Sequence, residues 1–229
     1  NGNVFGYNYS IEPYWNEVGL PSNSAGDMVL HGNYPYANLF EGNIAQNIVI
    51  DDSHGKNGSY NTFFRNRGEL YGVFMNNNPA SDNQNFIGNE VTNTGGFPLG
   101  LYSINGTGHF QYGDNVKGTI YATGTDSLTD TSYYYSSVPV FFQNFANWPS
   151  IGIPNIINTG SIPAKERYLS ANYTACGSGI PAGLIEMNVS DDMKIFPNPS
   201  DGLLYFRNPE NTSTPVQVSV YKGIGNITG

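Results

Sequence analysis

The sequence predicts an all-β fold, a parallel β-helix with about 23 residues per coil followed by a small β-sandwich, and two observations carry this prediction. The first is composition: of 229 residues, 38% are hydrophobic and 12% charged, with 28 Gly, 17 Tyr and 13 Phe. A surface built from Asn, Ser, Thr, Gly and Tyr is typical of extracellular β proteins. The second is a Phe-x-x-Asn pattern that recurs at a fixed spacing.

This pattern defines the repeat. Its Phe falls at residues 40, 63 and 86, and an earlier copy at Phe5 lies one period plus about 12 inserted residues before Phe40. Because parallel coils stack about 4.8 Å apart, residues one period apart form columns. An antiparallel sandwich is the alternative fold, but it needs no fixed period. We expect a Phe column in the core and an Asn ladder at a bend, formed by Phe40, Phe63 and Phe86 and by Asn43, Asn66 and Asn89.

The same spacing relates two His-Gly pairs, so the imidazoles of His31 and His54 are expected to be neighbours on one turn edge. Asp51 and Asp52 precede His54 in the densest group of ionisable residues. These four residues are the catalytic candidates, with His54 as a general base. Asp51 and Asp52 are alternatively calcium ligands, although no cofactor is required. The competing interpretation is an exposed polar turn, because adjacent strand residues point to opposite faces.

Other candidate contacts follow from the register. Arg67 and Glu90 differ by 23 and are expected to form a structural ion pair. Arg65 stacks between glycines, so its guanidinium is expected to reach outward to a ligand. Tyr34 and Tyr36 lie outside the core register and could stack on sugar rings. The alternative is that aromatic residues of this kind cover an exposed end of the repeat.

The charge pattern excludes two classes of partner. The formal net charge is −9, and the nine Lys and Arg are scattered. Phosphate-backbone binding requires clustered cations, so nucleic acid is not an expected partner. No apolar stretch reaches the roughly 20 residues that span a bilayer, so no membrane span is expected. Cys176 is the single cysteine, which excludes an intramolecular disulfide.

The repeat carries NLFEGN (38–43), HG (54–55) and NTFFRN (61–66), and the closing segment carries SLTDTSYY (127–134), NWPSIG (147–152) and IPAKERY (162–168). These segments resemble the secreted pectate-lyase-like right-handed parallel β-helix proteins. The resemblance covers about residues 1–173 and implies a right-handed β-helix with a C-terminal cap. That superfamily holds lyases, hydrolases, esterases and non-catalytic adhesins, so the resemblance implies architecture more than activity. The Arg-x-Lys of polygalacturonase-like hydrolases is lacking.

The C-terminal part carries KIFPNPSDG (194–202), LLYF (203–206) and VQVSVY (216–221), which predict strands around a Pro/Asn/Gly turn. It resembles the sorting domain of proteins exported by the type IX secretion system of Bacteroidota. Residues 174–193 are expected to be a linker and residues 194–229 a partial β-sandwich. The resemblance implies export to the medium or outer cell surface by that machinery. The sorting-signal residues are Phe196, Pro197, Asn198, Pro199 and Gly202.

Two functions remain open from the sequence. The first is a surface-displayed, non-catalytic β-helix that binds glycan or extracellular matrix, which the polar Tyr-rich surface and the few cations favour. The second is a secreted polysaccharide lyase or glycoside hydrolase, which the Asp51, Asp52 and His54 group favours. Release of new reducing ends or unsaturated uronates distinguishes them.

Overall fold

The computed structural model describes residues 1–13, 26–76 and 81–171, together with four short strands nearer the C-terminus. The chain divides into two compact units, Asn1–Tyr173 and Thr174–Gly229. Strands dominate the regular structure, and most of their pairings in the first unit are parallel. The prediction of an all-β fold is therefore confirmed.

The first sheet takes one short strand from each repeat. Neighbouring strands of this sheet are paired in parallel. Their register aligns Phe40 with Phe5 on one side and with Phe63 on the other, and it aligns Phe63 with Phe86. The rings stack nearly parallel, with centroids 5.0 Å apart between Phe40 and Phe63 and 5.3 Å apart between Phe63 and Phe86. The predicted Phe column is confirmed. In sheet order the strands are β1 (Val4–Gly6), β3 (Leu39–Glu41), β5 (Thr62–Phe64), β7 (Asn85–Ile87) and β10 (Phe110–Tyr112).

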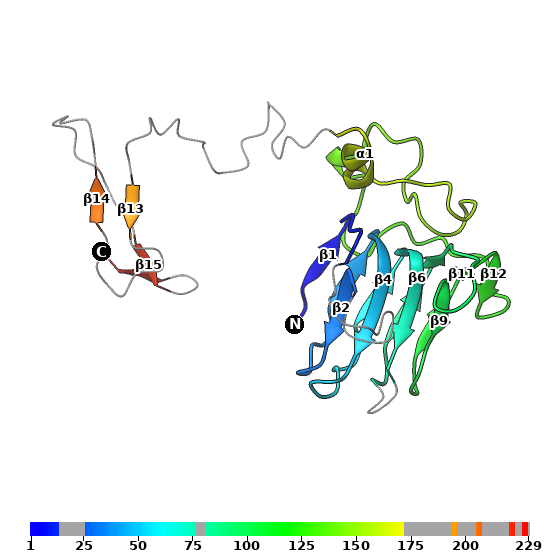
Figure 1. Ribbon diagram of the computed structural model, residues 1–229. Coiled ribbons are helices and arrows are strands. Elements are labelled where there is room, and N and C mark those ends of the chain that lie inside the picture. Colours follow the sequence, from blue (N-terminus) through cyan, green and yellow to red (C-terminus); the bar gives the residue numbers. More distant parts are fainter. Residues whose placement is uncertain are drawn as a thin grey trace. The chain divides into compact units, whose positions relative to one another are not determined.

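The second sheet lies opposite the first and contains the longer strands, which run side by side in Figure 1. Its pairings are parallel except for the hairpin at its edge, and β9 (Leu101–Ser103) pairs with the far end of β6. In sheet order the strands are β12 (Thr119–Tyr121), β11 (Asp114–Val116), β8 (Glu90–Val91), β6 (Arg67–Met75), β4 (Ile44–Asp51) and β2 (Met28–His31).

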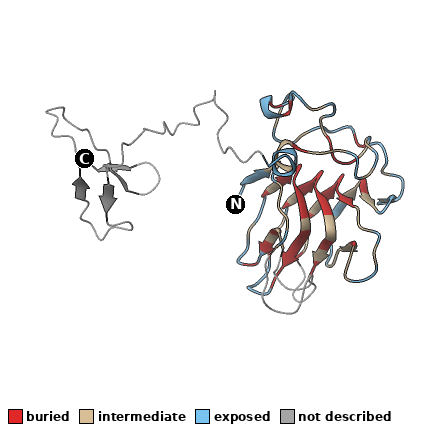
Figure 2. Ribbon diagram, turned by 45° about the horizontal axis from the view of Figure 1, so that its top comes forward, coloured by how far each residue is buried: buried red, intermediate tan, exposed pale blue. Residues whose placement is uncertain are grey.

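The core fills the space between the two sheets. Side chains alternate along a strand, so every second residue of each sheet faces the opposite one. The Phe column packs against aliphatic residues of the second sheet, including Leu30, Ile48, Ile50 and Val73. Figure 2 shows burial concentrated on the strands and exposure concentrated on the turns. Removal of this apolar surface from water is the main stabilising contribution.

Two ladders of side-chain amides run along the bends, and one of them was predicted. In the predicted ladder, each Nδ2 donates to the next Oδ1, at 2.8 Å from Asn43 to Asn66 and 3.1 Å from Asn66 to Asn89. The last rung ends on the carboxylate of Asp114, at 2.8 Å. These bonds satisfy polar groups that are buried. A second ladder passes through Asn3, Asn38, Asn61 and Gln84.

A closing segment, residues 128–164, covers the outer side of the strands and not an end of the repeat. Phe64 alternates with the inward-facing Phe63, so it faces outward, and Leu128 packs against it. Farther along the segment, Phe142 packs against Ile44. The segment contains the 3-10 helix η1 (Val140–Phe142) and the start of helix α1 (Pro163–Leu169).

In the second unit the structure describes two antiparallel strand pairs. They are β13 (Lys194–Phe196) with β14 (Tyr205–Arg207), and β15 (Val220–Lys222) with β16 (Asn226–Thr228). Phe196 therefore lies in a strand, as the sequence predicts. The other predicted sorting residues, Pro197, Asn198, Pro199 and Gly202, lie outside the described residues. Among the described helices, none has the length and apolar character needed to cross a bilayer.

Candidate functional site

Two neighbouring turns form one surface, here called the turn face: residues 31–37, which start at the last residue of β2, and residues 52–60, which follow β4. Backbone bonds tie them together, with the Tyr34 amide donating to the Lys56 carbonyl (3.0 Å) and the Ala37 amide to the Ser59 carbonyl (3.1 Å). Gly32 adopts φ +73°, and a Cβ there would lie 2.6 Å from the Gly55 carbonyl oxygen. Only glycine permits this close approach at position 32.

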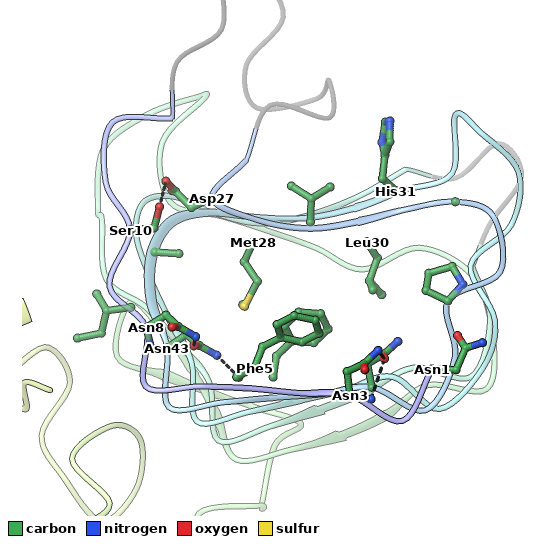
Figure 3. A pocket seen from close by; sticks show the side chains of 17 residues that line it. Asn1, Asn3, Phe5, Asn8, Ser10, Asp27, Met28, Leu30, His31 and Asn43 are labelled. Atoms are coloured by element: carbon green, nitrogen blue, oxygen red, sulfur yellow. Dashed lines mark hydrogen bonds between the residues drawn. The ribbon is translucent and has the colours of Figure 1, made fainter. Parts of the chain in front are cut away.

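The two predicted histidines meet on the turn face. The rings of His31 and His54 lie with centroids 4.3 Å apart, and both side chains are exposed. Figure 3 shows His31 pointing away from the core. Their predicted proximity is confirmed, but the strand register pairs His31 with Asp51, only 20 residues later. The longer turn after Asp51 then brings His54 back beside His31.

Asp51 is the carboxylate of this site. It is buried at the end of β4, and its Oδ2 contacts Nδ1 of His31. The Ser53 amide (3.0 Å) and the Asn76 side chain (2.8 Å) donate to its Oδ1, and the Ser53 hydroxyl (2.8 Å) donates to its Oδ2. Burial tends to raise the pKa of Asp51, but the bonds from Ser53 and His31 outweigh it and lower the pKa below its ordinary value.

Asp52 does not join the cluster of metal-ligating groups that the described residues form. That cluster consists of His31, Asp51 and His54, with one ligand atom from each lying within 4.8 Å of the others. Asp52 is 2% exposed, and its Oδ2 has no hydrogen-bond partner among the described residues. Burial raises the pKa of its carboxyl, and the charge of Asp51 adds to this effect. Both carboxylates of the expected calcium pair are therefore buried, and only Asp51 contributes to the cluster with the histidines.

The expectation for Arg65 is corrected. Its side chain is 2% exposed, and the guanidinium donates to the carbonyl oxygens of Asp130 (2.9 Å), Ile151 (2.8 Å) and Ile153 (2.7 Å). Burial lowers its pKa to about 10. Arg65 therefore holds the closing segment against the sheet and is not available to a surface ligand.

The ion pair predicted between Arg67 and Glu90 is present. Nε of Arg67 lies 2.7 Å from Oε2 of Glu90, and both side chains are buried. Glu90 also accepts hydrogen bonds from the Gly152 and Asn158 amides. The pair is structural, and it fixes a second point of the closing segment.

Three tyrosines project from the turn face. Tyr34 is 62% exposed, Tyr36 46% and Tyr60 67%. The rings of Tyr34 and Tyr36 lie 6.4 Å apart at 58° to each other. Gly58 lies beneath them, because a Cβ there would meet Cβ of Tyr36 at 2.7 Å and the Tyr34 ring at 3.1 Å. Tyr60 was not a sequence candidate, although its position one residue after Ser59 places it on the same surface.

A cavity of about 520 Å³ opens at the β1 side of the core. Met28, Leu30 and Phe5 project into it (Figure 3), so it continues the core between the sheets. The carboxylate at its rim, Asp27, accepts bonds from Ser10 (2.9 Å) and the Gln46 amide (2.7 Å). His31 is among the residues that line this cavity, but its side chain points away from the core and toward the turn face (Figure 3).

No family model, curated protein or solved structure matches this chain. The chemistry of the site is therefore argued from its own residues. The turn face offers aromatic surfaces beside a histidine and carboxylate cluster, on two turns whose backbones are hydrogen-bonded to each other.

Proposed function

We propose that the first unit is a right-handed parallel β-helix of an exported cell-surface protein, and that its turn face binds polysaccharide. The observation that carries the proposal is the exposure of Tyr34, Tyr36 and Tyr60 on two turns whose backbones are bonded together. The repeat register, the two facing parallel sheets and the resemblance in sequence support the β-helix.

Tyrosine is suited to this role because its ring packs on the apolar face of a pyranose and its hydroxyl remains free to hydrogen-bond. Close packing of the tyrosine side chains in the unbound protein also favours binding, because immobilising a mobile side chain on binding costs conformational entropy. Tyr34 and Tyr36 pack directly against Gly58, where the lack of a side chain leaves room for both of them. A chain with a net charge of −9 favours neutral over acidic glycans.

Replacing Tyr34 or Tyr36 with Ala is expected to weaken binding to a neutral polysaccharide about tenfold each, or about 1.4 kcal/mol. The loss comes from the ring surface that would otherwise cover a sugar. Affinity electrophoresis across acidic and neutral polysaccharides, with and without calcium, identifies the ligand. Titration calorimetry with oligosaccharides of that ligand then measures each variant.

Phe97→Ala is the matched control, because Phe97 is 84% exposed and lies outside the turn face. It should bind as the wild type does. Equal losses in the Phe97 and Tyr34 variants, or binding that survives a triple Tyr34, Tyr36 and Tyr60 substitution, would contradict the proposal.

A second candidate function, polysaccharide cleavage, is favoured by the contact between His31 and the buried Asp51. A carboxylate bonded to one imidazole nitrogen orients the ring and fixes which nitrogen carries the proton, which suits a general base. New reducing ends or unsaturated-uronate absorbance that disappear in His31→Asn would favour the enzyme. Tight binding without turnover favours the non-catalytic protein.

Removing residues 194–229 is expected to retain the protein inside the cell envelope of a Bacteroidota host that has the type IX machinery. The proposal assigns export to this segment and ligand binding to the first unit. Cell fractionation locates the truncated chain, and circular dichroism checks that its strands persist. As a complementary test, residues 174–229 fused to an unrelated periplasmic protein should carry it to the surface. Delivery of the truncated chain to the cell surface would contradict the assignment of export to residues 194–229.

A further inference from the structure

We propose that His31, Asp51 and His54 bind one divalent transition-metal ion, for which Zn²⁺ is the probe. One ligand atom from each residue lies within 4.8 Å of the others, and the residues come from β2, the end of β4 and the turn after it. A bound ion would replace the direct contact between His31 Nδ1 and Asp51 Oδ2, and both histidines are exposed and have room to reorient around it. The inference is independent of polysaccharide binding.

The ligand types select the class of metal. Two imidazole nitrogens and one carboxylate oxygen form a common set for Zn²⁺, Cu²⁺ or Ni²⁺. Calcium instead takes six to eight oxygen ligands, which three residues with a single carboxylate do not supply. Three protein ligands leave a fourth position open to water or to a ligand from solution.

Neighbouring groups hold two of the three ligands in position. The carboxylate of Asp51 is fixed by bonds from Ser53 and Asn76, and the Asn57 side chain donates to its backbone carbonyl (3.0 Å). The Ser53 hydroxyl also lies 3.1 Å from Nδ1 of His54, which leaves Nε2 free for a metal. Hydrogen bonds of this kind orient metal ligands and strengthen binding.

The backbone brings the two imidazoles together. Gly32 allows the turn after β2 to approach the Gly55 carbonyl so closely that a Cβ would lie 2.6 Å from it. The His31 and His54 rings, one residue before each glycine, then lie 4.3 Å apart. A larger residue at position 32 would separate the turns and the rings with them.

The electrostatic surroundings favour a cation. The chain carries a formal net charge of −9, and the Asp51 carboxylate lies directly beside the His31 ring. The His31 side chain is 44% exposed while that of Asp51 is 2% exposed, so an ion can enter from solvent on the imidazole side.

The test uses the full chain with Cys176→Ser, which removes its single thiol, after dialysis against a chelator. Titration calorimetry with Zn²⁺ should give about one ion per chain, and Co²⁺ should give visible d–d absorption of a site with nitrogen ligands. His31→Asn and His54→Asn should each weaken Zn²⁺ binding at least about tenfold. Both residues are exposed, so these substitutions leave the core intact.

His109→Asn is the matched control, because it also removes one imidazole. Its Nδ1 accepts from the Gln84 amide (3.1 Å) and its Nε2 contacts the Asn105 carbonyl (3.0 Å), so His109 is engaged within the fold. Circular dichroism checks that this variant folds, and Lys56→Ala serves as a second control on the turn face. Zn²⁺ affinity should be unchanged in both controls. Absence of saturable Zn²⁺ binding, tighter binding of Ca²⁺ than Zn²⁺, or wild-type affinity in the double His31 and His54 variant would overturn the proposal.

Discussion

Replacing Phe63 with Ala is expected to lower the free energy of unfolding by about 3–5 kcal/mol. Phe63 is 1% exposed and stacks on both sides, between Phe40 and Phe86. Truncation removes the apolar ring and leaves a cavity that neighbouring repeats cannot close, because hydrogen bonds fix the spacing between the strands. Urea denaturation followed by circular dichroism measures the change.

Two other phenylalanines calibrate this measurement. Phe5 stacks on Phe40 only and is 45% exposed, so Phe5→Ala should cost clearly less than Phe63→Ala. Phe97 is 84% exposed, and Phe97→Ala should leave the urea midpoint nearly unchanged. If all three variants lost the same stability, the column could not be the main element of the core.

The columns could be predicted from the sequence because parallel pairing converts a fixed spacing into direct contact. Phe40, Phe63 and Phe86 recur with one interval, and the strands that carry them pair in that register. The second ladder carried a weaker signal. Asn38 and Asn61 share the same interval, but Gln84 follows them, so no single residue type recurs.

The parts that were missed depend on turn length or on distant segments. The His31 and His54 contact follows the period, but the pairing of His31 with Asp51 reflects a shorter connection between β2 and β4. No pattern in the neighbouring sequence indicates the length of the connection between β2 and β4. Arg65 bonds to carbonyls 65 to 88 residues later in the chain, so its burial depends on where the closing segment packs.

Asp114 presents a different kind of departure from the repeat. It stands where the ladder of Asn43, Asn66 and Asn89 would place another amide, and it is fully buried. Its Oδ1 accepts from the Asn89 amide and side chain, both at 2.8 Å, and its Oδ2 accepts from the Tyr102 hydroxyl at 2.9 Å. Burial raises the pKa of Asp114 to about 7, against the opposing effect of these bonds.

Replacing Asp114 with Asn is therefore expected to stabilise the fold above pH 7. The carboxyl has a pKa of about 3.9 in the unfolded chain and about 7 in the folded one. Between these values the folded state binds more protons, so the wild type loses stability as the pH rises from about 4 through 7. A shift of this size corresponds to up to about 4 kcal/mol at pH 8. The amide avoids this loss because it carries no charge.

The substituted amide also fits the ladder. Its Oδ1 can keep the two bonds from Asn89, and its Nδ2 can donate to the Tyr102 hydroxyl, which is able to accept. Urea midpoints measured from pH 4 to pH 8 should fall for the wild type and stay flatter for Asp114→Asn, with the two curves meeting near pH 4. Asp126→Asn, at an exposed carboxylate, should follow the wild-type curve. A variant that is less stable than the wild type at pH 8 would mean that the ionised carboxylate strengthens the last rung by more than its burial costs.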